Sequence, residues 1–234
     1  MTENEFITSL NDLNIKITGI QLKQLNRYYE LLVEWNEKMN LTGITEKKEV
    51  YLKHFYDSLC IQKVINLYEE STLCDMGTGA GFPGLVLKIL FPNLKVYLID
   101  SLNKRIIFLD NVIEELQLDD VITVHSRIED YAKKHREEYD IVTARAVSKL
   151  NILLEYAIPM VKVGKYFIPL KAHVTDEIEK SNGAFKKLDC NLIKTESFLL
   201  PIEGSQRNIL LIKKNEITNK KYPRNNNEIR KKSL

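Results

Sequence analysis

Residues 71–84 read STLCDMGTGAGFPG, with glycine at positions 77, 79, 81 and 84. Because glycine tolerates a positive φ and has no side chain, such a segment can turn sharply and bring backbone N–H groups close to a ligand. An apolar segment with helical potential follows at residues 85–90, and a β-rich segment, residues 95–100, ends on an acid. A strand, a glycine turn, a helix, a strand and an acid form the first unit of a nucleotide-binding α/β sheet.

The chain length of 234 residues suits one α/β domain with a modest extension. No apolar run approaches the roughly 18–20 residues that a membrane span needs, and the acidic N-terminus does not resemble a signal peptide. The cysteines, Cys60, Cys74 and Cys190, are widely spaced, and the four histidines lack metal-ligand spacing. We therefore expect a cytoplasmic protein with reduced thiols and no structural metal.

Charge is unevenly distributed along the chain. The net charge is +2, but the 22 residues from Lys213 onward carry eight Lys/Arg and two Glu, which leaves −4 on the other 212 residues. A basic tail on an acidic body indicates contact with a polyanion such as nucleic acid. A solvated chain end explains the same pattern equally well, so charge alone leaves both interpretations open.

Periodicity divides the chain into three parts. Thr2-x-x-Glu5 and Thr18-x-x-Gln21 are capping boxes, and an apolar stripe follows the second as far as Met39. With another helix capped by Thr45, residues 1–70 are predicted to form a helical extension packed on the domain. Residues 71–214 are predicted to form a doubly wound, mostly parallel α/β domain, and residues 215–234 a basic tail. The expected strands are 72–76, 95–100, 121–125, 139–144, 166–170 and an antiparallel final pair, 193–199 and 208–213; the expected helices between them are 104–116, 151–161 and 176–187.

The glycine turn is compatible with two ligand classes. Counted from Gly79 it is Gly-x-Gly-x-x-Gly, with Asp100 about twenty residues further on, as in NAD-type dinucleotide-binding oxidoreductases. Counted from Asp75 it is Asp-x-Gly-x-Gly-x-Gly, the first motif of S-adenosylmethionine-dependent methyltransferases. A carboxylate at the end of the strand would repel a pyrophosphate but suits a ligand with a cationic methionine portion. Asp75 therefore favours the methyltransferase, and a glycine turn without any ligand is the third possibility.

Further candidate site residues follow the other strands. Asp100, at the end of the second strand, could accept hydrogen bonds from ribose hydroxyls or could cap the next helix. Ile128 and Glu129 follow the third strand and suit an adenine, with one apolar and one hydrogen-bonding neighbour. Arg145 follows the fourth strand among small and apolar residues, where a guanidinium is costly unless it pairs. It is predicted either to bind an anionic group in the site or to form a structural ion pair.

Several methyl acceptors are disfavoured. There is no Asp/Asn-Pro-Pro-Tyr motif for exocyclic amines, and no cysteine follows the Pro or Thr that usually precedes the nucleophile of cytosine-C5 enzymes. A ring nitrogen such as guanine N7 has a free lone pair and needs no general base. Positioning alone can supply roughly 7–11 kcal/mol of the barrier reduction. A site without an obvious base is therefore consistent with N7 transfer.

An ordered set of motifs runs through nearly the whole chain: Trp35-Asn36-x-x-x-Asn40-Leu41-Thr42, His54-Phe55-x-Asp57-Ser58-Leu59, residues 75–84, Asp100-Ser101-x-x-Lys104-Arg105, Arg127-x-Glu129, Ala144-Arg145-Ala146, Lys171, Arg207 and Lys221-Tyr222-Pro223-Arg224. This set resembles one family, RsmG (also called GidB), the bacterial 16S ribosomal RNA guanine-N7 methyltransferases. The resemblance implies a Rossmann-like methyltransferase fold with S-adenosylmethionine as cofactor.

The resemblance and the motifs together imply three groups of site residues. Those expected to bind or support the cofactor are Asp75, Gly77, Gly79, Gly81, Phe82, Asp100, Ile128, Glu129 and Arg145. Those expected near the acceptor guanine, with no catalytic role assigned, are His54, Asp57, Ser58 and Arg145. Those expected to bind RNA are Lys104, Arg105, Lys171, Arg207, Lys220, Lys221 and Arg224.

The expected partner is 16S RNA or the 30S subunit, bound by a monomer. Two departures from the family pattern, Ala172 after Lys171 and residues 225–227 in a normally more basic run, affect the expected RNA contacts. An NAD-type oxidoreductase and a catalytically silent RNA-binding protein are the alternative functions.

Overall fold

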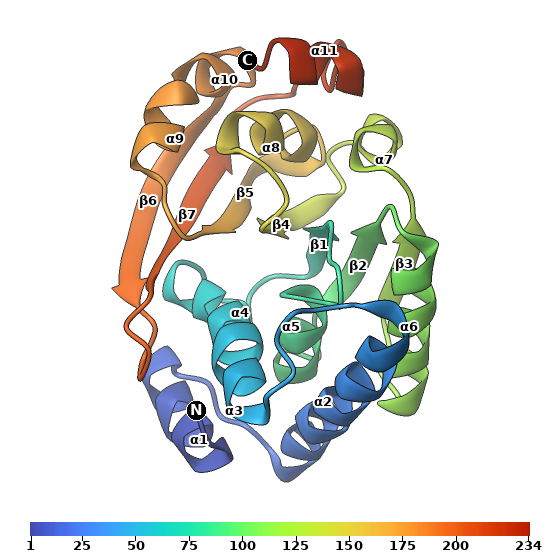
Figure 1. Ribbon diagram of the computed structural model, residues 1–234. Coiled ribbons are helices and arrows are strands. Elements are labelled where there is room, and N and C mark those ends of the chain that lie inside the picture. The colour runs from blue at the N-terminus through green and yellow to red at the C-terminus, as the bar shows by residue number, and fades with distance from the viewer.

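A computed structural model describes residues 1–234, apart from the side chain of Thr175. Its centre is a seven-stranded sheet in the order β3-β2-β1-β4-β5-β7-β6 (Figure 1). The strands are β1 Thr72–Met76, β2 Lys95–Asp100, β3 Val121–His125, β4 Tyr139–Arg145, β5 Val161–Lys171, β6 Cys190–Leu199 and β7 Gln206–Lys214. The first five are parallel, and β7 runs antiparallel to both of its neighbours. The predicted fold class, with its antiparallel final pair, is confirmed.

The sheet separates two hydrophobic cores. The larger core joins the N-terminal helices to α5 and α6 on one face, through side chains such as Phe55, Leu85 and Phe108. The other core joins α7, α8 and the C-terminal segment on the opposite face. The helices that follow β1 are α5 Gly84–Leu90, α6 Asn103–Glu115, α7 Ile128–Lys134, α8 Leu150–Ala157, α9 Thr175–Lys180, α10 Asn182–Lys187 and α11 Asn226–Lys231.

Before the sheet, the chain is helical as predicted. Both capping boxes form, because Thr2 accepts from the Glu5 N–H and Thr18 from the Gln21 N–H. The next helix is capped by the Glu46 side chain rather than by the predicted Thr45. These elements are α1 Glu3–Leu10, η1 Asn11–Leu13, α2 Gly19–Met39, α3 Lys47–Val50, η2 Tyr51–Tyr56, α4 Asp57–Leu59 and η3 Cys60–Lys63; η2 is a π-helical segment.

Several predicted boundaries were wrong. Helix α8 ends at Ala157 instead of 161, and β6 begins at Cys190 instead of 193. Strand β5 begins at Val161 instead of 166, because a bulge around Gly164, at φ +83°, lets residues on both sides of it pair with β4. The single helix predicted for 176–187 is two helices that meet at Ser181. The Ser181 hydroxyl donates to the Glu177 carbonyl at 2.6 Å and is fully buried, and such back-bonding bends helices. The tail, predicted only as basic, contains α11.

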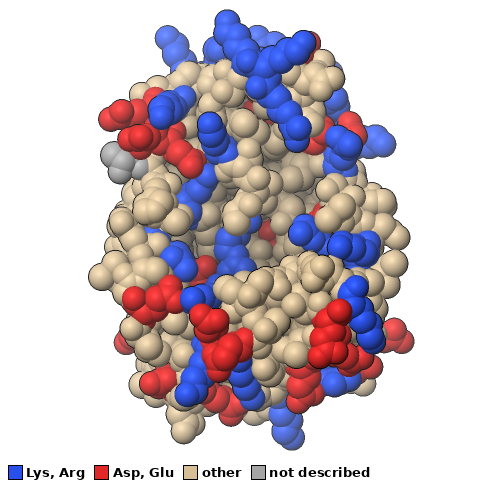
Figure 2. Space-filling view, viewed as in Figure 1, with Lys and Arg blue, Asp and Glu red and all other residues tan. Residues whose placement is uncertain are grey.

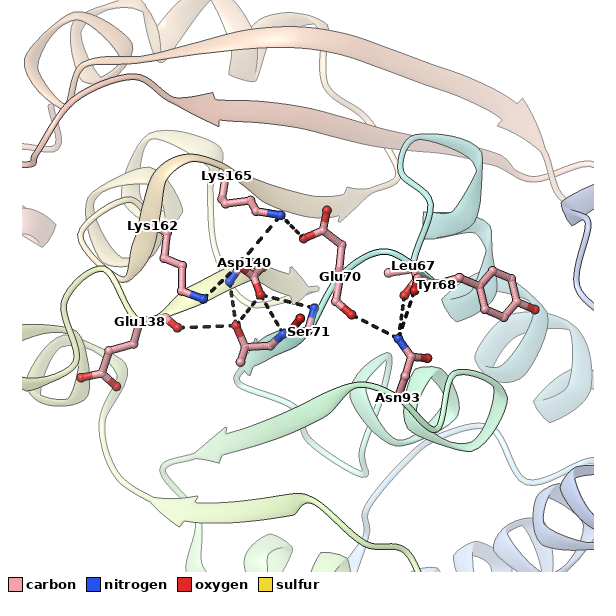
Figure 3. Close-up of polar contacts among 10 residues, drawn as sticks. Leu67, Tyr68, Glu70, Ser71, Asn93, Glu138, Asp140, Lys162 and Lys165 are labelled. Carbon is pink, nitrogen blue, oxygen red and sulfur yellow. Dashed lines mark hydrogen bonds and ion pairs between the residues drawn. The ribbon is translucent and has the colours of Figure 1, made fainter.

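A polar cluster ties together the amino ends of the central strands (Figure 3). Asp140 Oδ2 accepts from the Thr72 N–H at 3.0 Å, and its Oδ1 lies 3.0 Å from Lys162 Nζ. Glu70 lies 2.6 Å from Lys165 Nζ, and its carbonyl accepts from the Asn93 amide.

In the part of the chain that the structure describes, no helix is both long and apolar enough to cross a membrane.

Candidate active site

The glycine turn between β1 and α5 has the positive φ angles that its composition predicts. Gly77, Gly79 and Gly81 have φ of +67°, +62° and +97°. A Cβ on Gly77 would lie 2.8 Å from a methyl carbon of Val147, whereas a Cβ on Gly79 would meet nothing within 4 Å. A Cβ on Gly81 would collide with the Tyr28 hydroxyl, which donates to the Ala80 carbonyl. Gly77 therefore allows the turn to approach Val147, Gly79 is favoured only by its positive φ, and Gly81 allows α2 to pack on the turn.

Asp75 braces this turn from inside the sheet. Its side chain is fully buried, and Oδ2 accepts from the Thr78 hydroxyl at 2.7 Å and from the Gly84 N–H at 2.8 Å. Burial raises the pKa of Asp75 to about 6, although both hydrogen bonds oppose the shift. Its buried Oδ1 has no hydrogen-bond partner among the described residues. The structure thus places Asp75 behind the turn rather than on a cavity surface.

Asp100 bonds the backbone at the start of the next helix and also borders a cavity. Its Oδ1 accepts from the Leu102 N–H at 2.9 Å, at the start of α6. Its Oδ2 accepts from the Gly79 N–H and from Arg105 Nη1, both at 3.0 Å. Asp100 also lines the larger ligand-sized cavity at this end of the sheet. Arg105, predicted to bind RNA, is thereby paired within the chain.

This first cavity has a volume of about 600 Å³, within the range of small-molecule sites. Ile128 and Val147 supply apolar surface, while Asp100 and Glu129 supply carboxylate acceptors. Gly77 forms part of the floor. The cavity therefore combines an apolar slot with hydrogen-bond acceptors at the carboxyl edge of the sheet, where ligands of such folds bind.

A second cavity, of about 410 Å³, adjoins the first, because Ala146 lines both. Its charged lining residues are Lys53, Asp57, Arg145, Lys171 and Arg207, and His54 also lines it. Ala146 has φ +56°, an uncommon conformation for a residue other than glycine. Figure 2 shows the face as a central hollow with Lys and Arg side chains inside it and around it. The two cavities therefore lie at a basic, hollowed surface.

Arg145 is the centre of a hydrogen-bonded network in the second cavity. Its Nη1 lies 3.1 Å from Asp57 Oδ2 and donates to the Lys53 carbonyl at 2.9 Å, and its Nη2 lies 3.2 Å from His54 Nδ1. Arg207 Nε reaches the other Asp57 oxygen at 3.2 Å. Arg145 thus forms the ion pair that was one of its two predicted roles, and it also lines a cavity.

His54 is held neutral in this network. Burial and the Arg145 charge lower its pKa to about 3. Because Arg145 donates to Nδ1, the proton of the neutral ring belongs on Nε2, 3.0 Å from the Thr42 hydroxyl. The ring also stacks on Phe82 at 4.4 Å between centroids. Phe82 therefore touches the network from the glycine turn.

The remaining predicted residues are placed as follows. The Ser58 hydroxyl is buried and donates to the His54 carbonyl, inside the helix. Lys104 donates to the Met39 carbonyl, and Lys171 pairs with Glu177 at 2.6 Å. Arg224 pairs with Glu155 on α8. Of the seven predicted RNA-binding residues, only Lys220 and Lys221 have no hydrogen bond or ion pair from the charged group among the described residues.

Sequence reasoning missed several cavity residues. Val147 could have been found, because it follows Arg145 beyond the end of β4, at the ligand edge. Ile152, Tyr156, Asn226 and Arg230 of the first cavity had no sequence signal, because they come from the outer layer and the tail. The described residues contain no group of three or more His, Cys, Asp or Glu that could hold a metal ion.

The comparison that decides the family is a match of residues 21–210 to the model for GidB, rRNA small subunit methyltransferase G. The chain belongs to this family. It is 50% identical over 227 residues to the ribosomal RNA small subunit methyltransferase G of Bacillus licheniformis, which covers 96% of this chain and 95% of that one. The corresponding protein of Listeria welshimeri is 47% identical over the same shares. The resemblance inferred from the ordered motifs is confirmed.

Solved structures show the same fold at low identity. TYW2 from M. jannaschii, in complex with AdoMet, has a TM-score of 0.51 and 17% identity, over 62% of this chain and 70% of that one. A SAM-dependent O-methyltransferase from Thermotoga maritima has a TM-score of 0.52 and 15% identity, over 79% and 72%. These likenesses support the fold alone.

Proposed function

We propose that this chain transfers a methyl group from S-adenosylmethionine to N7 of a guanine in 16S ribosomal RNA. The family membership confirms the predicted enzyme class, an S-adenosylmethionine-dependent methyltransferase of small-subunit ribosomal RNA. The observation that supports the acceptor is the pair of adjoining cavities, of which the second contains a buried carboxylate, arginines and no available general base. The NAD-type oxidoreductase is not supported by the family.

The first cavity fits S-adenosylmethionine. The absence of a side chain at Gly77 keeps its floor clear, and the Asp100 carboxylate can accept from ribose hydroxyls. Ile128 offers an apolar wall to the adenine, and Glu129 an acceptor for its amino group. When bound, the cofactor supplies an electrophilic methyl group on a sulfonium, which the guanine N7 lone pair can accept without releasing a proton.

The second cavity suits the guanine. Asp57 can accept from guanine N–H groups, since each of its oxygens accepts one hydrogen bond from an arginine and a carboxylate has about four acceptor sites. Arg207 and Lys171 provide positive charge for O6 or for phosphates. His54, neutral and bonded at both nitrogens, does not act as a base. The residues of this cavity therefore orient the base and exclude water, as the chemistry of N7 requires.

The assigned residues follow from this placement. Gly77, Asp100, Ile128 and Glu129 form the cofactor side, and Gly79 donates to Asp100. Phe82 and Arg145 lie at the junction with the second cavity, and Asp75 and Gly81 support the turn. The division into a helical extension, 1–70, a methyltransferase domain, 71–214, and a tail, 215–234, is kept in this proposal. The proposal also keeps a cytoplasmic monomer whose substrate is 16S RNA or the 30S subunit.

The test is tritiated methyl transfer to 30S subunits and to 16S RNA that lack the modification, with the product nucleoside identified. Labelled 7-methylguanosine at one position is the expected result. Label in another nucleoside would contradict the guanine N7 assignment. Cofactor binding without transfer to either acceptor would instead favour the catalytically silent RNA-binding protein.

The cofactor role of Asp100 is tested separately. Asp100→Ala removes the acceptor at the end of β2 and should weaken binding of S-adenosylhomocysteine, measured by calorimetry. Asp119→Ala, at an exposed carboxylate outside both cavities, is the matched control. Normal affinity in the Asp100 variant would contradict its ribose role.

A further inference from the structure

The C-terminal segment is anchored on α8 by a buried ion pair. The Arg224 guanidinium reaches Glu155 at 2.8 Å through Nε and at 2.7 Å through Nη2, and the Arg224 N–H adds a third bond at 2.9 Å. Glu155 is fully buried. A bidentate pair of this kind is directional, so it sets both the position and the orientation of the chain that follows.

Additional contacts hold the segment on both sides of α11. Arg136 donates to the carbonyls of Thr218 and Tyr222, both at 2.6 Å. After the helix, the Ser233 hydroxyl accepts from the Asn151 amide at 2.7 Å. Ile229 of α11 is fully buried in the core of this face. Figure 1 shows α11 in red at the same end of the molecule as α8 and α7. The tail is therefore an integral layer of the fold.

One face of α11 lines the first cavity. Asn226 and Arg230 are four residues apart, so they lie on the same side of the helix, and both line the cavity with Ile152 and Tyr156 of α8. The Tyr156 hydroxyl donates to Asn226 Oδ1 at 2.9 Å, which fixes the start of this face. Arg230 is exposed, and its guanidinium has no hydrogen bond or ion pair within the described structure. Arg230 is therefore a cation at the cavity surface that has no ion-pair partner among the described residues.

Arg230 lines the same cavity as Glu129, Ile128 and Tyr156. Burial raises the pKa of the Tyr156 phenol and Glu129 adds to the increase, while the charge of Arg230 acts to lower that pKa. Because Glu129 and Ile128 are the residues assigned to the adenine, Arg230 shares a cavity with the residues proposed to hold the adenosine moiety.

We propose that α11 forms the outer wall of the cofactor cavity and that Arg230 binds the adenosine moiety of S-adenosylmethionine. This inference rests on the proposed function. A guanidinium has five N–H donors and no acceptor, and it also stacks on flat rings. Adenine ring nitrogens and ribose oxygens are acceptors, so they complement Arg230, while the adenine amino group complements Glu129. The segment that composition marks as RNA-binding thus also contributes to the cofactor site.

The test measures S-adenosylhomocysteine binding by calorimetry for wild type, Arg230→Ala, Arg230→Lys and Lys231→Ala. Lys231 is the matched control, an exposed cation on the same helix that lines neither cavity. Loss of one charge-assisted contact should raise the dissociation constant of Arg230→Ala about tenfold. Arg230→Lys should recover part of the affinity, and Lys231→Ala should stay within about twofold of wild type. All variants should melt at the wild-type temperature, because the changed side chains are exposed.

Two results would overturn the inference while leaving the proposed function intact. One is wild-type affinity in Arg230→Ala together with a raised KM for 30S subunits, which would make Arg230 an RNA-phosphate contact. The other is an equal loss in Lys231→Ala, which would indicate a general charge effect. If the wild-type protein bound no S-adenosylhomocysteine, the proposed function itself would fail, and this inference with it.

Discussion

Buried carboxylates occur at both ends of the sheet, but their partners and surroundings differ. At the amino end, Asp140 and Glu70 pair with Lys162 and Lys165, and Asp140 also binds the backbone at the start of β1 (Figure 3). None of these residues lines the first or the second cavity. Burial acts to raise the pKa of Asp140, but Lys162 and Thr72 outweigh it, and the net shift is downward.

At the carboxyl end, arginines replace lysines and cavities lie beside the pairs. Asp57 is bound by Arg145 and Arg207, which come from strands far along the chain, and this network lines the second cavity. Asp75 keeps one buried oxygen without a partner and has a raised pKa. The comparison teaches that a dense polar cluster does not by itself mark a site. The site is the cluster that borders open space.

The largest expected effect is on stability, at the amino end. Asp140→Ala leaves strand-end N–H groups and Lys162 without their acceptor, so it should lower the free energy of unfolding by about 3 kcal/mol. Urea denaturation measures this. Lys162→Met, at a side chain that is 41% exposed, is the control and should cost less than about 1 kcal/mol. A loss of kcat in fully folded Asp140→Ala would contradict the purely structural role.

The second prediction concerns the carboxyl end. Arg145→Gln removes the hydrogen bonds to Asp57 and His54 and should lower kcat for methyl transfer about 100-fold, because a misplaced acceptor is costly to the rate. Single-turnover transfer to 30S subunits measures this. Lys165→Gln, at the opposite end of the sheet, should leave kcat unchanged in the folded enzyme. Equal losses in the two variants would remove the functional difference between the ends.

A pH series sharpens the contrast within the carboxyl end. His54 has a pKa of about 3 in the folded protein, well below the usual value, so below about pH 6.5 the unfolded state binds a proton that the folded state does not. This contribution destabilises the fold progressively as the pH falls toward 3. Asp75, with a pKa of about 6, has the opposite slope, since between about pH 4 and 6 the folded state holds the extra proton. The two slopes therefore oppose each other over that interval.

The substitution His54→Gln removes the contribution of His54 to the pH dependence of stability. Relative to wild type, its free energy of unfolding should rise by about 1.4 kcal/mol for each pH unit lowered between pH 6 and 4. Urea denaturation at several pH values gives the difference directly. A difference that does not vary with pH would mean that His54 titrates normally in the folded state.

The smallest expected effect lies in the tail. Lys220 and Lys221 are exposed, and replacing both by alanine should reduce the slope of log affinity against log salt for 16S RNA by about 0.7–0.9 per lost phosphate contact. Filter binding at several salt concentrations measures this. Stability should not change, in contrast to Asp140→Ala. An unchanged slope would remove these two lysines from the RNA interface.

Much of the fold could be read from local patterns. The strands β1, β2 and β3 have the predicted bounds, because alternating or continuous β-rich segments were bounded by turn residues. The glycine turn was predicted because no other residue takes its backbone angles at low cost. The capping boxes were predictable because donor and acceptor lie three residues apart. The boundaries at Ser181 and Gly164 were not, since they depend on a single buried hydroxyl and on strand pairing.

The sequence by itself determined the fold class, the glycine turn, the order of the ligand-edge residues and, through the ordered motifs, the family. Only the tertiary structure decided which of those residues face a cavity and which are already paired. Arg145 meets Asp57 across 88 positions, and Arg224 meets Glu155 across 69. Such pairs depend on how layers pack, and no local pattern reports that packing. For the same reason, the charge of the tail could be read from the sequence, but its position beside the first cavity is seen only in the folded structure.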